Sequence, residues 1–98
     1  MMKSKAVNDL AAEVEAKTLN LIDVREADEF ASGHLPGAIN LPLSDFLERY
    51  EELDKGKSYH IICRSGARSA QACAFLEEEG YDVTNVAGGT IAWLGDLE

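Results

Sequence analysis

Short apolar segments alternate along this chain with segments whose apolar residues recur at helical spacing. The apolar segments predict four strands, at residues 19–24, 38–41, 59–62 and 83–86. Strands of this kind carry apolar residues at nearly every position, which is typical of strands covered on both faces. The alternation therefore predicts an α/β fold, with a mostly parallel sheet flanked by helices on both faces.

The segments between the strands predict the helices. Asn8 is expected to cap a helix over 9–17, and a second helix is expected over 67–79, ended by Gly80. Another helix is predicted from four apolar residues spaced i, i+3, i+4 and i+7: Leu43, Phe46, Leu47 and Tyr50. A short last helix is expected after Gly88-Gly89.

Size and composition limit the possible classes of function. The 98 residues predict a single domain over 1–98, and no apolar stretch approaches the roughly 20 residues that cross a bilayer. The net charge of −9 argues against nucleic acids and anionic membranes as partners. With two cysteines and no apolar leader segment, we expect a monomer in the reducing cytoplasm.

Polar and small residues follow three of the predicted strands, in segments 23–26, 63–69 and 87–90. The carboxyl ends of parallel strands meet at one edge of a sheet, and functional groups gather there. Three of the four arginines lie in these segments, and two of them, Arg64 and Arg68, lie in the segment that begins with Cys63. We therefore expect the three segments to converge around Cys63.

The segment CRSGARS (63–69) has the residues needed for a tight turn leading into a helix. Small residues and Gly66 allow successive backbone N–H groups to point into one concavity, which binds an anion. The following helix adds its free N–H groups and the positive end of its dipole. A cysteine sulfur facing this concavity is expected to ionise near neutral pH and act as a nucleophile.

The length of this loop separates two classes of chemistry. The cradle of protein-tyrosine phosphatases has the pattern C-x5-R and holds a phosphate, whereas Cys63 and Arg68 form C-x4-R. One residue fewer gives a smaller ring of amides, suited to a single sulfur atom. The loop therefore favours sulfur chemistry over phosphoryl chemistry.

From about residue 6 to residue 94, the chain resembles the single-domain rhodanese (thiosulfate sulfurtransferase) family. Three segments carry the resemblance: LIDVREADEFASGHLPGAINLPL (21–43), CRSGARS (63–69) and VAGGTIAW (86–93). It implies a rhodanese-like, five-stranded, mainly parallel sheet, with the extra strand near residues 5–7.

By position, the resemblance implies that Cys63 accepts a sulfane sulfur from thiosulfate or a related persulfide donor and passes it on from a persulfide. The acceptor would be cyanide in an assay, and a thiol or a protein in the cell. No metal or organic cofactor is implied. The expected binding residues are Arg64, Ser65, Gly66, Ala67, Arg68 and Ser69, with Arg68 and Arg64 attracting the anionic donor.

Supporting roles are expected for Asp23 and Arg25, which follow a strand beside the loop. We interpret Asp23 as a carboxylate that accepts hydrogen bonds from backbone amides, and Arg25 as paired with an acid such as Glu29. Gly88-Gly89 is expected to let the backbone pass close to the loop. Structural roles are expected for four further residues: Cys73, Trp93, His34 and His60.

Two alternatives remain open. Related folds place a cysteine in a similar cradle for phosphatase or arsenate reductase chemistry, and the short loop counts against that function. The other alternative is a non-enzymatic module, either a sulfur carrier or a regulatory domain that acts with a partner protein. The intact cysteine counts against a module without any sulfur chemistry.

Overall fold

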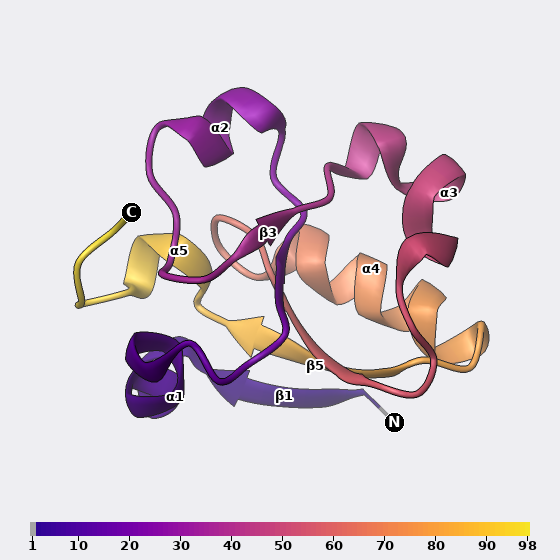
Figure 1. Ribbon diagram of the computed structural model, residues 1–98, viewed down its shortest axis with the longest axis horizontal. Helices are drawn as coiled ribbons and strands as arrows, with labels where there is room; N and C mark the ends of the chain where they lie inside the picture. Colours follow the sequence, from indigo (N-terminus) through magenta and orange to yellow (C-terminus); the bar gives the residue numbers. More distant parts are fainter. Residues whose placement is uncertain (1) are drawn as a thin grey trace.

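The computed structural model describes residues 2–98. Its strands are β1 (Lys3–Ala6), β2 (Leu21–Asp23), β3 (Ile39–Asn40), β4 (Ser58–Ile62) and β5 (Asp82–Ala87). They form one sheet in the order β1-β5-β4-β2-β3, and every pairing is parallel (Figure 1). The predicted α/β fold with a five-stranded parallel sheet is confirmed, and its fifth strand lies at 3–6, slightly before the expected position.

The helices are α1 (Ala11–Ala16), α2 (Ala27–Ala31), α3 (Phe46–Arg49), α4 (Ala67–Glu78) and α5 (Gly89–Ala92). Short 3-10 turns precede α1 (η1, Val7–Leu10) and flank α3 (η2, Leu43–Asp45, and η3, Tyr50–Glu52). The 12-residue α4 has nearly the predicted bounds and ends just before Gly80. No helix within residues 2–98 has the length and apolar character needed to span a membrane.

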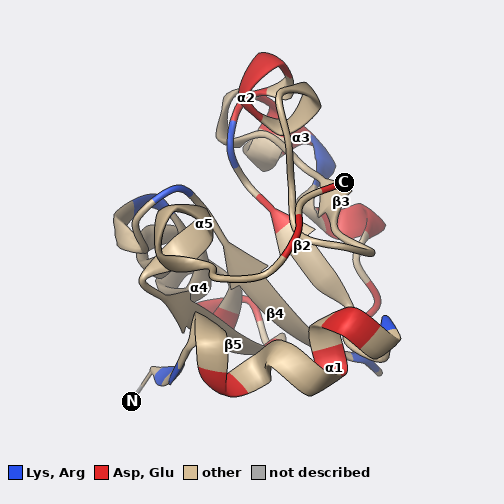
Figure 2. Ribbon diagram, turned by 90° about the vertical axis from the view of Figure 1, so that its left-hand side faces the viewer, with Lys and Arg blue, Asp and Glu red and all other residues tan. Residues whose placement is uncertain are grey.

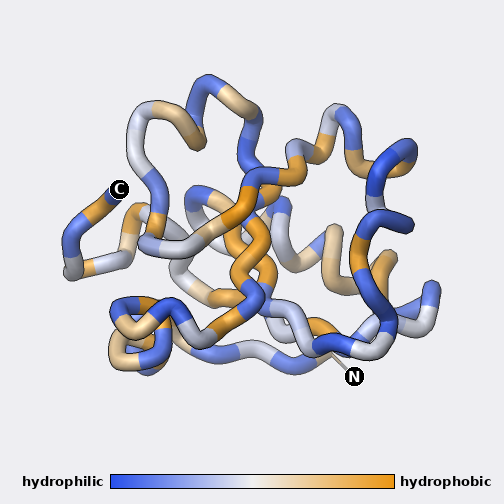
Figure 3. Tube along the Cα trace, viewed as in Figure 1, coloured by the Kyte–Doolittle hydropathy of each residue, from blue (hydrophilic) through white to orange (hydrophobic). Residues whose placement is uncertain are grey.

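The sheet separates two hydrophobic clusters. One cluster packs under α3 and α4 and includes Ile22 and Ile61, and the other packs under η1 and α1 and includes Leu21 and Ile62. Neighbouring residues of a strand point to opposite faces, so each central strand contributes to both clusters. Burying each such side chain stabilises the fold by about 1.5–3 kcal/mol. Apolar positions accordingly concentrate on the central strands (Figure 3).

Three local expectations were wrong or incomplete. Asn8 caps no helix: its side chain donates to the carbonyl of Ala92 and accepts from the amide of Leu94, which joins η1 to the segment after α5. Leu47 does not join the apolar face of α3, since 72% of its surface is exposed. The five-residue α2 was not predicted.

The ends of β4 and β5 meet as expected. The amide of Thr90 donates to the carbonyl of Cys63 and that of Ile91 to the carbonyl of Arg64, both at 3.0 Å. Gly89, at φ +63°, makes this approach possible, because a Cβ there would lie 2.4 Å from the Arg64 oxygen. Only glycine fits this contact.

We therefore predict that Gly89→Ala lowers the free energy of unfolding by about 2–4 kcal/mol, through the contact with the loop and the left-handed backbone. Gly56→Ala is the matched control, because Gly56 has no left-handed backbone and its nearest neighbour is the flexible side chain of Asp54. Urea denaturation of both variants measures the difference. Equal losses of stability would contradict the proposed close approach.

Candidate functional site

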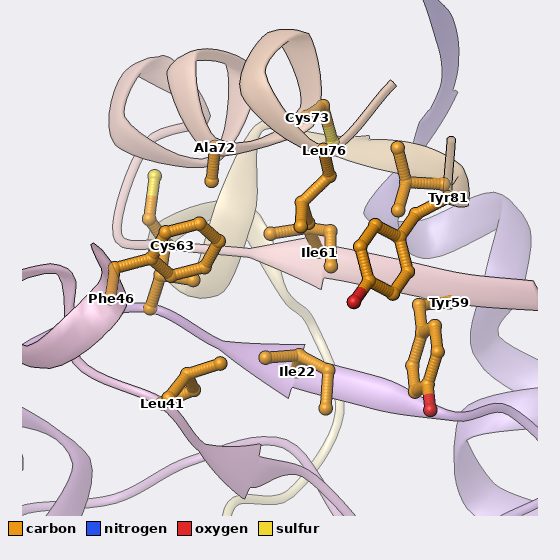
Figure 4. Close-up of a cluster of buried hydrophobic side chains, with 12 residues drawn as sticks. Ile22, Leu41, Phe46, Tyr59, Ile61, Cys63, Ala72, Cys73, Leu76 and Tyr81 are labelled. Atoms are coloured by element: carbon orange, nitrogen blue, oxygen red, sulfur yellow. The ribbon is translucent and has the colours of Figure 1, made fainter. Parts of the chain in front are cut away.

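Cys63 directly follows β4 and lies at the base of the turn that leads into α4. Only 1% of its surface is exposed, and its sulfur points toward the turn (Figure 4). The backbone N–H of Gly66 donates to the sulfur at 3.1 Å, and the hydroxyl of Ser69 lies 3.3 Å from it. The sulfur therefore faces hydrogen-bond donors rather than only the apolar core.

These donors favour the thiolate. Burial raises the pKa of the Cys63 thiol, but the Ser69 hydroxyl and the backbone N–H groups of Ser69, Gly66 and Ser65 lower it further than burial raises it. The net effect is a pKa below the ordinary value for cysteine. An ionised sulfur held this way is suited to nucleophilic attack.

The other loop residues have distinct surroundings. Ser65 and Ala67 are exposed, and Ser69 is fully buried. Gly66 precedes the first residue of α4 with φ +105°, a conformation that favours glycine. Of the amides in this turn, that of Gly66 donates to the Cys63 sulfur.

The two arginines of the loop differ in their partners. Arg68 forms a two-pronged ion pair with Glu29 of α2, at 2.8 and 3.0 Å. The hydrogen bond from Arg68 is the largest of the effects that lower the pKa of Glu29 to about 2. Arg64 is exposed and forms no ion pair with any described Asp or Glu. Of the two arginines in the loop, Arg64 is therefore the one whose positive charge no described carboxylate neutralises.

Arg25 pairs with Asp23 and not with Glu29, contrary to the expectation. Its guanidinium donates to Oδ2 of Asp23 at 2.8 and 3.0 Å and to Oδ1 at 3.1 Å, and it also donates to the carbonyl of Gly33. The backbone N–H of Arg25 donates to the same carboxylate at 3.0 Å. Because both side chains are buried, this pair fixes the segment after β2 next to the loop.

A pocket of about 370 Å³ opens beside the loop. Its walls come from the segments after β2, β4 and β5, and from the chain end: Arg25, Glu29, Ser32, Arg64, Thr90, Ile91 and Leu97. Acidic residues spread over α1 and α2, whereas the turn before α4 carries basic ones (Figure 2). The pocket therefore opens beside the basic turn, with Arg64 in its wall.

The remaining candidate residues lie in structural positions. Cys73 is buried on α4, away from Cys63 (Figure 4), and burial is the main cause that raises its pKa to about 12. Trp93 is 8% exposed in the second cluster. His34 stacks on Phe30 with ring centroids 3.8 Å apart. No cluster of three or more His, Cys, Asp or Glu within residues 2–98 is arranged to hold a metal.

Sequence reasoning missed Asn85, a buried residue of β5 whose side-chain oxygen lies 2.6 Å from the Ser69 hydroxyl. The signal was present as an amide inside the otherwise apolar strand segment VTNV (83–86). Glu29 was noticed, but as a partner of the wrong arginine.

We predict that iodoacetamide alkylates Cys63 about tenfold or more faster than Cys73 at pH 7, because only the Cys63 thiolate is stabilised. The rate should rise with pH and level off at a lower pH than in the urea-unfolded chain, since the folded pKa is lowered. Ser69→Ala should raise the midpoint and slow the reaction at pH 7 about tenfold. Peptide mass spectrometry measures each site.

Thr18→Ala, which removes an exposed hydroxyl in a distant turn, is the control and should leave the profile unchanged. A folded profile that coincides with the unfolded one would show that the loop does not stabilise the thiolate.

Comparisons with known proteins agree with the fold. A rhodanese-like domain protein from Staphylococcus aureus has the same fold, with a TM-score of 0.88, 37% identity, and coverage of 99% of this chain and 97% of that one. YtwF of Bacillus subtilis is 47% identical over 90 residues, which is 91% of this chain and 87% of that protein. The thiosulfate sulfurtransferase GlpE of Shewanella oneidensis is 33% identical over 92 residues, covering 93% and 91%.

The family model of the rhodanese-like domain matches residues 6–96, a range that holds the whole reactive loop and all three converging segments. The chain therefore belongs to the rhodanese-like domain family.

Proposed function

We propose that this protein is a sulfurtransferase that moves a sulfane sulfur through a persulfide on Cys63, with thiosulfate or a related persulfide as donor. The observation that carries the proposal is the set of hydrogen-bond donors around the Cys63 sulfur, which stabilise a negative charge at that point. Homologues with sulfurtransferase names support the same class of reaction.

In the first step, the Cys63 thiolate attacks the outer sulfur of thiosulfate. A new S–S bond forms to Cys63, the S–S bond of thiosulfate breaks, and sulfite leaves with the bonding electron pair. The negative charge moves to the outer sulfur of the persulfide, where the N–H groups of the turn stabilise it in the manner of an oxyanion hole.

In the second step, an acceptor nucleophile attacks the outer sulfur of the persulfide. Cyanide takes this sulfur as thiocyanate, and the S–S bond breaks to return the Cys63 thiolate. A thiol acceptor would form a new persulfide and return the same thiolate. The cycle needs no net oxidant or reductant, and we propose that it needs no metal or organic cofactor.

The charges around the pocket support an anionic donor attracted by Arg64. Arg25 and Arg68 are each neutralised by a carboxylate, whereas Arg64 lines the pocket with its charge free of any described ion pair. Arg68 therefore holds α2 against the loop, and Arg64 supplies the field that a dianion such as thiosulfate meets first.

We predict that thiosulfate adds one sulfur, about 32 Da, to the protein, and that cyanide removes it. Cys63→Ser should abolish the gain, and Cys73→Ser should keep it because that thiol lies away from the loop. Intact-protein mass spectrometry follows each step. Hydrolysis of p-nitrophenyl phosphate in the same preparation would instead support the phosphatase alternative.

Protein that stays unmodified across several sulfane donors would refute the sulfurtransferase and favour the module that acts only with a protein partner.

We further predict that Arg64→Gln raises the KM for thiosulfate about three- to tenfold with little change in kcat, because it removes an attraction of roughly 1 kcal/mol at an exposed site. Raising the salt concentration should reduce the difference. Arg49→Gln is the matched control, since Arg49 is exposed on α3 and lies in ion pairs with Asp45 and Glu52. A loss in kcat alone would contradict this role.

A further inference from the structure

The hydroxyl of Ser69 has more acceptors around it than it can serve. Its oxygen lies 3.3 Å from the Cys63 sulfur, 2.6 Å from Oδ1 of Asn85 and 3.2 Å from the carbonyl of Gly66. A hydroxyl carries one hydrogen, so it can donate fully to only one of them. The Gly66 carbonyl already accepts the amide of Ala70 at 3.1 Å. The competition is therefore between Cys63 and Asn85.

While Cys63 is protonated, the arrangement satisfies every group. A thiol hydrogen directed at the Ser69 oxygen would leave the Ser69 hydrogen for Oδ1 of Asn85, across the short 2.6 Å contact. This orientation also lets Nδ2 of Asn85 face the Gly66 carbonyl, at 3.5 Å.

Ionisation of Cys63 changes which group needs a hydrogen-bond donor. The proton leaves to solvent, and the thiolate now requires a donor, so the Ser69 hydrogen turns to the sulfur. The Ser69 oxygen and Oδ1 of Asn85 would then face each other at 2.6 Å with no hydrogen between them, which is unfavourable in a buried site.

A half-turn of the Asn85 carboxamide removes this conflict. Its oxygen and nitrogen occupy nearly equivalent positions, so the turn brings Nδ2 to the Ser69 oxygen as a donor. The bond given up is the 3.5 Å contact with Gly66, which is too long to contribute much. The exchange supplies the missing hydrogen. Its cost is that Oδ1 of Asn85 then lies near the Gly66 carbonyl oxygen, but at about 3.5 Å the repulsion between these two acceptors is weaker than at 2.6 Å.

We propose that Asn85 is a positioning residue, whose amide donates to Ser69 when Cys63 is ionised and so directs the Ser69 hydrogen at the reacting sulfur. A buried amide on a central strand, 6% exposed and paired in register with Ile61, thereby has a functional reason to be there. The inference rests on the proposed role of Cys63 as nucleophile.

Other groups also act on the charge of Cys63 and must be held constant. Two side chains of α4, Arg68 and Cys73, interact electrostatically with Cys63. Glu29 of α2 and Asp23 of β2 in turn raise the pKa of Arg68. None of them contacts Asn85 through the hydrogen bonds described for residues 2–98.

The test compares the pH profile of Cys63 alkylation in Asn85→Leu, which has a similar volume and no hydrogen-bonding group, with and without Ser69→Ala. In the chain that keeps Ser69, Asn85→Leu should raise the midpoint of the alkylation profile by about half a pH unit to one pH unit. In the Ser69→Ala background, Asn85→Leu should leave the midpoint unchanged, because the hydroxyl through which Asn85 acts is gone. Asn20→Leu, the same replacement at an exposed amide that donates to the Ser58 carbonyl, is the control and should shift nothing.

An equal shift in both backgrounds, or none in either, overturns the proposal. Should Asn85→Leu fail to fold, the wild-type chain decides: the side-chain amide resonances of Asn85 should titrate with the midpoint of Cys63, and not at all in Cys63→Ser. Resonances that ignore pH overturn the inference. A chain that shows these shifts but takes no sulfur from any donor refutes the proposed function and leaves this inference standing.

Discussion

Two backbone hydrogen bonds determine which way the reactive turn faces. The carbonyls of Cys63 and Arg64 point toward α5 and accept hydrogen bonds from the amides of Thr90 and Ile91. In a trans peptide the N–H points opposite to the C=O, so the amides that follow these two carbonyls turn away from α5. The N–H of Ser65 is one of the groups that stabilise the Cys63 thiolate. The environment of the Cys63 sulfur thus depends on contacts made by residues near the C-terminus.

The main elements could be predicted because their signals are local and repeated. The apolar runs around β4 and β5 are long enough to show strands buried on both faces, and α4 has a full apolar face and a glycine at its end. The convergence of the loops then follows from the parallel sheet alone. The cradle around Cys63 was predictable for the same reason, since it needs only a strand, a small-residue turn and a helix in sequence.

The errors concern partners that only the folded chain brings together. Arg68 and Glu29 are 39 positions apart, and no local feature of the sequence favours Arg68 over Arg25 as the partner of Glu29. The same is true of Asn8, which bonds residues more than 80 positions away instead of capping a helix. At five residues, α2 is too short to show periodicity, and Glu29, whose carboxylate accepts the N–H of Glu26, helps to define it.

The near-complete enclosure of Cys63 affects the shape of molecule that the site can accept. With about one hundredth of its surface in contact with solvent, this side chain offers a reagent a narrow aperture. A terminal sulfur, bonded to a single atom, meets less steric hindrance at such a site than the sulfur of an ordinary disulfide, which is bonded to a carbon and to a second sulfur. The enclosure of Cys63 therefore favours slender reagents over bulky ones, in addition to any selection by charge.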